Sequence, residues 1–306
     1  MITRRVVAAA AISLALFGRP AAALDWKAQV PELTLAVVPV ENANPTTERH
    51  APLADYLTRK LGVPVKLRVA KDYAAVIEGQ RAGAIHIAWY GPASYAQAVL
   101  SGAKIQPLVT QRHENGSTGY NAVIYVLATS PYQSVEDLKG KTLALVDPDS
   151  TSGNQAPRYF LKRAGVDLDK HFGKTFFAGS HENAVVALAQ GNADAAANYW
   201  TSDSETMVTR LTAKGLLKTP DGKPMSQSDF RIVFKSDFLP YGPFAVLASL
   251  PIDLKAEIRA AFMALPQEDK GAFDRLSDGK DIGFATVKLA DYEPIVEMLR
   301  FNREQH

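Results

Sequence analysis

Short apolar runs alternate with amphipathic segments along the first third of the chain. The run from Leu33 to Val40 (LTLAVVPV) is followed by a polar stretch, which is typical of a buried strand and the loop after it. Residues 49–61 place their apolar side chains on one helical face, and Gly62 ends this segment. The alternation of strand and helix predicts a parallel sheet covered by helices on both faces. The predicted strands are 33–40, 63–69 and 85–89, and the predicted helices are 49–61 and 73–80.

The same alternation begins again after residue 120. Two α/β units without a proline- or serine-rich linker favour two lobes joined by crossing strands, at 120–128 and 231–247. The chain then returns to the first lobe, with helices near 254–265 and 291–301. The predicted lobes are residues 24–120 together with 242–306, and residues 121–241. The other predicted elements are strands over 142–146, 175–177 and 193–198, helices over 155–164 and 182–190, and a helical turn over 135–138.

Residues 1–23 have the pattern of a secretory signal peptide. Arg4 and Arg5 precede an apolar segment that runs to Phe17, and small residues follow up to Ala23. We expect cleavage near Ala23 and a soluble protein exported to the periplasm, because no later segment is apolar over about 18 residues. The ordinary secretory route is the default, although the paired arginines also fit the twin-arginine route.

Composition removes several classes of function. The chain has no cysteine, which excludes disulfides, thiolate nucleophiles, iron–sulfur clusters and cysteine-ligated zinc. Loss of residues 1–23 would remove three arginines and leave 31 basic against 32 acidic residues, a net charge of −1. A nearly neutral chain without a block of like charges gives no support for binding to nucleic acids or membrane surfaces. We expect no metal and no other cofactor, because there is no Walker loop and no metal-binding spacing among His50, His86, His113 and His171.

The candidate chemistry lies in two loops that follow predicted strands. In the first, Ser150, Thr151 and Ser152 precede Gly153 and a helix, so hydroxyls and unpaired N–H groups meet at the positive end of the helix dipole. Such a loop either binds an oxyanion, with the glycine allowing its close approach, or simply caps the helix. The second loop brings His181 to another helix start. Because ligands bind at the carboxyl ends of parallel strands, we expect both loops at one site.

The first lobe contributes two tyrosines to this prediction. Tyr90 follows the strand over 85–89, and Tyr73 lies at the start of a helix. At these positions the rings can form the wall of a pocket while the hydroxyls donate to an oxyanion. We expect Trp89, by contrast, to belong to the hydrophobic core.

Four motifs together resemble the periplasmic phosphonate/phosphite/phosphate-binding proteins of ABC importers. They are KDY at 71–73, IAWYG at 87–91, DPDSTSG at 147–153 and GSHE at 179–182. The resemblance covers residues 31–265 and implies a type II-like, two-lobed periplasmic-binding fold, with parallel sheets, flanking helices and two crossing hinge strands. It implies that Tyr73 and Tyr90 of one lobe face Ser150, Thr151, Ser152 and His181 of the other.

The resemblance also implies a function and its partners. We expect a solute receptor without catalysis, which captures a phosphorus oxyanion in the cleft and delivers it to an ABC permease in the inner membrane. We expect the receptor to be a monomer. Relatives that carry aminoalkylphosphonates are expected to pair the ammonium with carboxylates, and here those places resemble Thr201 and Gly242. An unpaired buried ammonium is costly, so this sequence favours phosphite, phosphate or methylphosphonate, unless Asp203 or Asp237 takes over the pairing.

One alternative is an exported hydrolase of phosphate or acyl esters. Ser150 or Ser152 would then be the nucleophile and His181 the base, with Glu182 or Asp149 as the orienting acid. A further alternative is the sensing domain of a signalling protein. It has less support, because we expect no additional domain or membrane span in the sequence up to His306.

Overall fold

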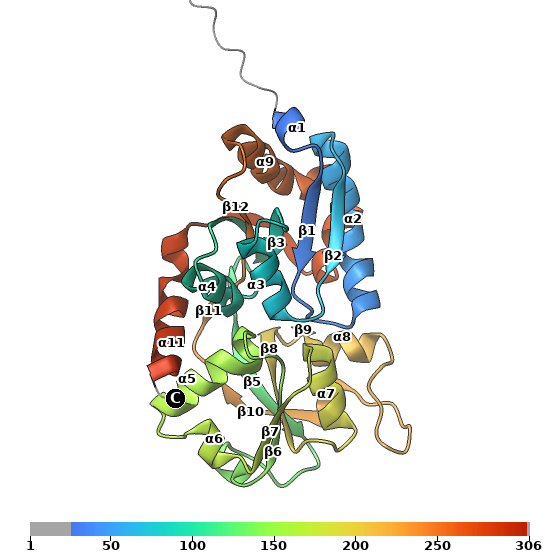
Figure 1. Ribbon diagram of the computed structural model, residues 1–306. Helices are drawn as coiled ribbons and strands as arrows, with labels where there is room; N and C mark the ends of the chain where they lie inside the picture. Colours follow the sequence, from blue (N-terminus) through green and yellow to red (C-terminus); the bar gives the residue numbers. More distant parts are fainter. Residues whose placement is uncertain (1–25, 305–306) are drawn as a thin grey trace, which may run out of the picture.

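A computed structural model describes residues 26–304 and shows two mixed β-sheets with helices packed against them (Figure 1). The predicted signal peptide and its cleavage site lie outside the described residues. Of the helices in the described part of the chain, none combines the length and the apolar character needed to cross a membrane.

The first sheet has the strand order β13-β4-β12-β3-β1-β2. Its β1, β2 and β3 are parallel, as the β-α-β-α-β pattern predicts, whereas β12, β4 and β13 join antiparallel. The strands are β1 (Leu33–Val37), β2 (Val65–Val69), β3 (Ile87–Trp89), β4 (Ile105–His113), β12 (Phe244–Leu247) and β13 (Asp281–Thr286). The helices are α1 (Trp26–Gln29), α2 (Ala43–Leu61), α3 (Tyr73–Arg81), α4 (Pro92–Leu100), α9 (Ile252–Glu268), α10 (Lys270–Ser277) and α11 (Glu293–Glu304).

The second sheet has the order β10-β5-β8-β6-β7, with β9 paired to β8 and β11 paired to β5. Here too β6 is parallel to both β7 and β8, and β5 and β10 are antiparallel. Its strands are β5 (Gly119–Leu127), β6 (Thr142–Leu145), β7 (Lys174–Phe177), β8 (Ala195–Ser202), β9 (Glu205–Thr206), β10 (Phe230–Lys235) and β11 (Leu239–Pro240). Its helices are α5 (Ala156–Arg163), α6 (Leu168–His171), α7 (His181–Ala189) and α8 (Met207–Ala213).

The predicted parallel arrangement therefore holds for part of each sheet, and both sheets are mixed. The chain passes from the first sheet to the second between β4 and β5 and returns between β10 and β12. Strands on either side of these passages enter their sheets antiparallel to the strands already present. The β-α-β pattern indicates only the strands that have a helix between them.

Helix α2 shows how the ends of elements differ from the sequence prediction. It begins at Ala43, six residues before the predicted start, and ends as predicted at Gly62, whose φ of 71° suits glycine. The early turns were not predicted because their buried face is polar: Thr46 and Arg49 are buried there. That face lies toward the cavity described below.

Hydrophobic packing links the two sheets. We call each sheet together with the helices packed on it a layer. One core cluster contains Tyr73 and Tyr90 of the first sheet's layer together with Val123 and Val146 of the second sheet's layer. Helix α11 packs against both α4 and α5, so the C-terminal helix touches elements of both sheets (Figure 1). The sequence prediction placed it with the first lobe alone.

Candidate functional site

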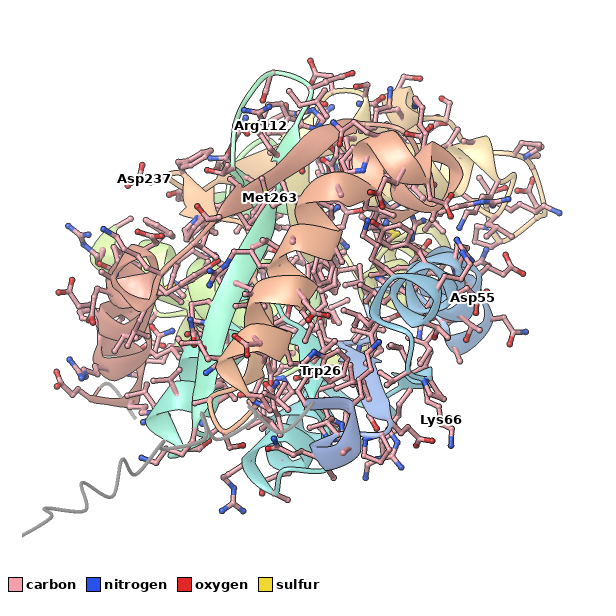
Figure 2. The ribbon with its side chains drawn as sticks, turned by 90° about the horizontal axis from the view of Figure 1, so that it is seen from above. Trp26, Asp55, Lys66, Arg112, Asp237 and Met263 are labelled. Atoms are coloured by element: carbon pink, nitrogen blue, oxygen red, sulfur yellow. The ribbon has the colours of Figure 1, made fainter. Side chains whose placement is uncertain are left out.

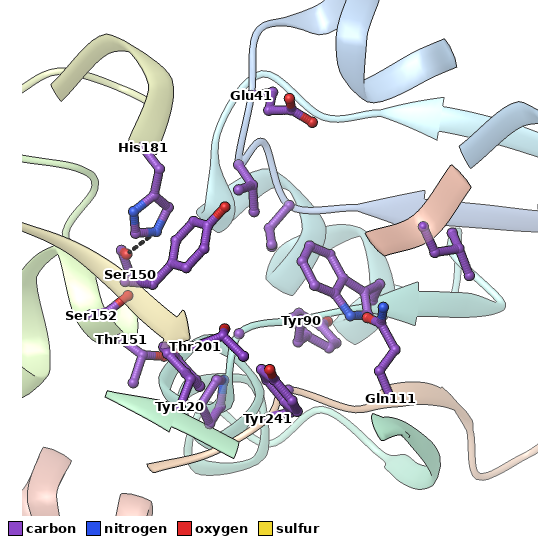
Figure 3. Close-up of a pocket in the computed structure, with 18 of the residues that line it drawn as sticks. Glu41, Tyr90, Gln111, Tyr120, Ser150, Thr151, Ser152, His181, Thr201 and Tyr241 are labelled. Carbon is purple, nitrogen blue, oxygen red and sulfur yellow. Dashed lines mark hydrogen bonds between the residues drawn. The ribbon is translucent and has the colours of Figure 1, made fainter. Parts of the chain in front are cut away.

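A cavity of about 130 Å³ lies between the two sheets (Figure 3). Residues from both sheets line it, and many of them come from loops at strand ends or from helix starts. The six predicted ligand-binding residues all contribute to its lining: Tyr73, Tyr90, Ser150, Thr151, Ser152 and His181.

The loop that contains Ser150, Thr151 and Ser152, here called the hydroxyl loop, makes contacts with elements of both sheets. Ser150 caps a π-helical turn, because its Oγ accepts a 3.1 Å hydrogen bond from the backbone N–H of Gly153. Thr151 Oγ1 accepts a 2.8 Å hydrogen bond from the backbone N–H of Ala93, in the first turn of α4. The loop thus serves as a helix cap, as one reading of the sequence predicts, and also lies where two helix N-termini converge on the cavity.

Gly153 has a packing role that the sequence analysis did not predict. A Cβ atom at this position would lie 2.3 Å from Val146 side-chain atoms and 2.7 Å from Ser150 Oγ. Close packing of the turn on the end of β6 therefore requires glycine here, whatever the approach of a ligand.

His181 is held as a neutral hydrogen-bond acceptor. Its Nδ1 lies 3.2 Å from Oδ1 of Asn198, and that oxygen is identified by its 3.0 Å bond from the Tyr199 N–H. Nδ1 must therefore carry the proton, and Nε2 accepts from the Ser150 hydroxyl at 3.3 Å (Figure 3). Burial lowers the pKa of His181 to about 4.

Two buried tyrosines face the hydroxyl loop, and the sequence prediction missed one of them. Burial raises the pKa of Tyr73 far above its ordinary value, although the Ser150 side chain opposes the rise. Burial also raises the pKa of Tyr120 to about 12, against the hydroxyls of Thr151 and Ser152. Both phenols are therefore neutral donors at pH 7. Tyr120 was assigned only to a crossing strand, and its place directly after Gly119 gave no signal of a site.

Tyr90 lines the cavity, but its hydroxyl is engaged elsewhere. It donates to Oε1 of Gln80 at 2.9 Å, and Gln80 in turn donates to the carbonyl of Ala245 at 3.1 Å. This corrects the expectation that the Tyr90 hydroxyl faces the oxyanion. Trp89, expected in the core, packs on Phe244 and also lines the cavity.

Ion pairs form another part of the lining, which the sequence analysis missed. Glu41 accepts from Arg49 Nε at 2.7 Å and from Lys214 Nζ at 2.9 Å, and it lies 3.8 Å from Arg210 Nη1. Burial by itself would raise the pKa of Glu41, but the guanidinium groups of Arg210 and Arg49 outweigh it and lower the pKa to about 2. Asp278 completes the cluster, 2.9 Å from Arg210 Nε. The members come from both sheets' layers, which is why no local motif predicts them.

Further hydrogen bonds join the two layers beside the cavity. The backbone N–H of His181 donates to the carbonyl of Val40 at 3.1 Å. The carboxylate of Glu182 accepts from the backbone N–H and the side-chain amide of Asn42, both at 2.9 Å. In this structure the layers are therefore closed on each other.

The two positions predicted to lack a carboxylate both line the cavity. Thr201 lies beside the Tyr241 hydroxyl, and Gly242 is so tightly packed that a Cβ would lie 1.6 Å from the Tyr90 carbonyl oxygen. No side chain fits at residue 242 without a backbone shift. Asp203 and Asp237 are exposed, and Figure 2 shows Asp237 on the outside of the molecule.

Two other acids do line the cavity. Burial raises the pKa of Glu205 to about 8 and that of Asp281 to about 6. They lie on β9 and β13, one in each sheet.

Comparison with known proteins identifies the family. Residues 35–292 match the family described as "ABC transporter, phosphonate, periplasmic substrate-binding protein". The chain is 31% identical to the phosphate-import protein PhnD of Mycolicibacterium smegmatis, over 86% of this chain and 83% of that protein. It is 29% identical to the phosphonates-binding periplasmic protein of Escherichia coli, over 80% of this chain and 70% of that one.

A solved structure supports the fold. PhnD1 from Prochlorococcus marinus, in complex with methylphosphonate, superposes with a TM-score of 0.72 at 22% identity, covering 89% of this chain and 98% of that one. The predicted periplasmic-binding fold is thereby confirmed. The matched family consists of substrate-binding components of transporters, so the alternative of an exported hydrolase is not supported.

Proposed function

Because the chain belongs to the family of periplasmic substrate-binding proteins of phosphonate ABC transporters, we propose that it captures a small phosphorus oxyanion in the cavity between its sheets. As a member of this family it is a transport component of the periplasm rather than an enzyme. The substrates named for its relatives, phosphate and phosphonates, define the class of ligand that we propose.

The observation that carries the proposal is the convergence of uncharged donors on one cavity. The hydroxyls of Tyr73, Tyr120 and Ser152 belong to this set, and the first N–H groups of the turn after Ser150 lack intrahelical acceptors. Hydrogen bonds from such donors to an ionised oxygen are shorter and stronger than bonds between neutral groups. A closed, water-poor cavity strengthens them further.

His181 adds an acceptor to this set of donors. A singly protonated phosphonate or phosphate has acceptor oxygens and one O–H group. A neutral imidazole beside hydroxyl donors matches that combination, since Nε2 can accept from the ligand O–H in place of Ser150. The site residues that we propose are Tyr73, Tyr120, Ser150, Thr151, Ser152 and His181.

The sheet boundaries support a hinge. We propose that residues 24–120 with 242–306 form one lobe and residues 121–241 the other, and that the passages between β4 and β5 and between β10 and β12 are the hinge. Helix α11, which touches both lobes, would then pivot or slide on α5 during opening. We also propose that the receptor is a monomer and that the closed form docks on the permease.

Calorimetric titration tests the proposal. We expect binding of phosphite, phosphate or methylphosphonate, and weaker binding of sulfate, which has no O–H for His181 at neutral pH. Ser152→Ala or Thr151→Val should weaken binding by about 1.5–3 kcal/mol per charge-assisted hydrogen bond lost. Ser228→Ala, an exposed serine outside the cavity lining, is the matched control. Unchanged affinity in both cavity variants would leave the loop as a helix cap only.

A further inference from the structure

A group of side chains that could bind a metal ion lies where the two sheets meet beside the cavity. His113 and Asp281 are paired residues of β4 and β13 in the first sheet, and Glu205 belongs to β9 in the second. One ligand atom of each residue lies within 4.8 Å of the others. Glu205 and Asp281 also line the cavity.

The imidazole of His113 is buried without a hydrogen bond. Its side chain is 1% exposed, and neither ring nitrogen makes a hydrogen bond within the described residues. Side chains of neighbouring residues in a strand point to opposite faces. Because the side chain of Arg112 points to solvent, the ring of His113 in the same strand points inward (Figure 2). A buried polar group that makes no hydrogen bond is costly, so this ring indicates a ligand.

The surroundings of His113 have the arrangement of ligands around one cation. Nδ1 lies 2.8 Å from Oε2 of Glu205 and 3.8 Å from Oδ1 of Asp281. Glu205 Oε2 also makes no hydrogen bond within the described residues, so the short distance is not an aligned N–H···O contact. A bound divalent cation would displace any proton from the two carboxyl groups. The neutral imidazole and the two ionised carboxylates would then have a charge of −2, which the cation balances.

We propose that His113, Glu205 and Asp281 bind a divalent first-row transition metal, with zinc as the representative ion. One imidazole nitrogen and two carboxylate oxygens form a donor set that suits such borderline ions better than magnesium or calcium. Gln111 donates from its amide to Asp281, which orients this carboxylate as an outer partner of a metal ligand. Ligand atoms around zinc lie about 3.0–3.4 Å apart, so the Asp281 carboxylate must move closer to the other two.

The placement of the site gives the ion a consequence. Its ligands come from both sheets, so a bound ion links the two lobes and favours the closed arrangement. Three protein ligands leave a coordination position open, and two of them line the cavity, so a water or an oxygen of a bound anion can occupy it. The histidine spacing predicts no metal site because the three residues are widely separated in the sequence.

Titration of the purified, tag-free protein with zinc chloride, in buffer free of phosphate and sulfate, tests this site. We expect one equivalent to bind, and cobalt(II) to give visible absorption bands when it replaces zinc. His113→Gln and Glu205→Gln should each weaken binding by about tenfold or more. His86→Gln, which removes an imidazole elsewhere in the first sheet, should leave zinc binding unchanged.

Two outcomes would overturn the proposal. One is absence of zinc binding and of cobalt absorption in the folded wild-type protein, which would leave His113 and Glu205 as an ion pair only. The other is zinc affinity in Glu205→Gln and Asp281→Asn equal to that of wild type. These variants decide the matter if His113→Gln does not fold. Titration of the same sample with methylphosphonate separates this result from the oxyanion proposal, because that site uses other residues.

Discussion

The two ends of the cavity differ in the kind of polar group that lines them: uncharged groups at the end near Ser150, and ion pairs at the end near Glu41. Around Ser150 and Tyr120 the polar groups are uncharged, and several of them point at the cavity with capacity to donate. Around Glu41 the groups are fully charged, but Arg49 and Arg210 already pair with carboxylates. The arginines, usually the strongest anion ligands, are thus occupied by carboxylates here, which is why we propose neutral donors for the oxyanion.

The charged end has a different task. Glu41 and Asp278 come from the first sheet's layer, whereas Arg210 lies in α8 beside the second sheet and Lys214 directly follows this helix. Their ion pairs therefore cross the gap between the lobes. In the proposed function, this charged end would hold the closed form together and the uncharged end would recognise the ligand.

The largest expected effect comes from breaking the charged end. Glu41→Gln removes a buried carboxylate and its 2.7 Å ion pair with Arg49, which then keeps, among the described residues, only the 3.2 Å pair with the exposed Asp278. We expect the free energy of unfolding to fall by about 3 kcal/mol, because removing one partner of a buried ion pair is strongly destabilising. Urea unfolding of both proteins at pH 7 measures the difference.

A matched variant sharpens this test. Glu78→Gln removes the same group from an exposed pair with Arg81, for which we expect little or no change in the free energy of unfolding. Equal effects of the two substitutions would mean that the ion pairs between the lobes are screened by solvent.

The contrast between the ends also explains what the sequence could predict. The loop at 147–153 is a local motif, in which neighbouring residues and one helix start provide the donors, and the structure places it on the cavity as predicted. The strands separated by helices were predicted for the same reason, since their pattern is periodic and local. The charged cluster forms only when the chain folds, because it brings together Glu41, Arg210 and Asp278. Their spacing along the sequence does not predict that they are neighbours.

Errors within the uncharged end have a related cause. Tyr90 and Tyr120 both follow predicted strand or loop boundaries, and sequence position does not show where a hydroxyl points. Gln80 of α3 accepts a hydrogen bond from the Tyr90 hydroxyl, and Tyr120, at the start of β5, lies beside the hydroxyls of Thr151 and Ser152. Side-chain direction at a strand end depends on these tertiary partners.

The second prediction concerns selectivity for an uncharged ligand tail. Thr201 and Gly242 offer no carboxylate, and Gly242 has no space for one. We expect methylphosphonate to bind at least about tenfold more tightly than aminoethylphosphonate, and about a hundredfold if the full penalty of about 3 kcal/mol applies. Competition titrations at one pH and salt concentration measure the ratio.

Equal or tighter binding of the amine would contradict this selectivity. Glu205 and Asp281 are the acids on the cavity wall that would then pair the ammonium. Glu205→Gln would in that case lower the affinity for aminoethylphosphonate and leave methylphosphonate binding unchanged.

The third prediction separates the two tyrosines. Tyr120→Phe removes a hydroxyl beside Thr151 and Ser152 and should weaken methylphosphonate binding by about 1.5 kcal/mol, roughly tenfold. Tyr90→Phe removes the bond to Gln80, so it should lower the free energy of unfolding by about 1 kcal/mol and leave affinity unchanged. Calorimetry and urea unfolding of both variants give the comparison. Loss of affinity in Tyr90→Phe alone would reverse the assignment.

The smallest effect tests whether the recognising end is uncharged before the ligand arrives. Burial lowers the pKa of His181 from 6.5 to about 4, so between these pH values only the unfolded chain binds the proton. Stability must therefore fall as pH falls through this range, by about 1 kcal/mol between pH 7.5 and 5.5 for this one histidine. In urea unfolding, His181→Gln should lose that much less stability over the same interval. His50, whose pKa burial also lowers to about 4, keeps its own share in both proteins. Identical pH dependence of wild type and variant would mean that His181 takes up a proton as readily in the folded state as in the unfolded chain. The two ends of the cavity would then differ less than the structure indicates.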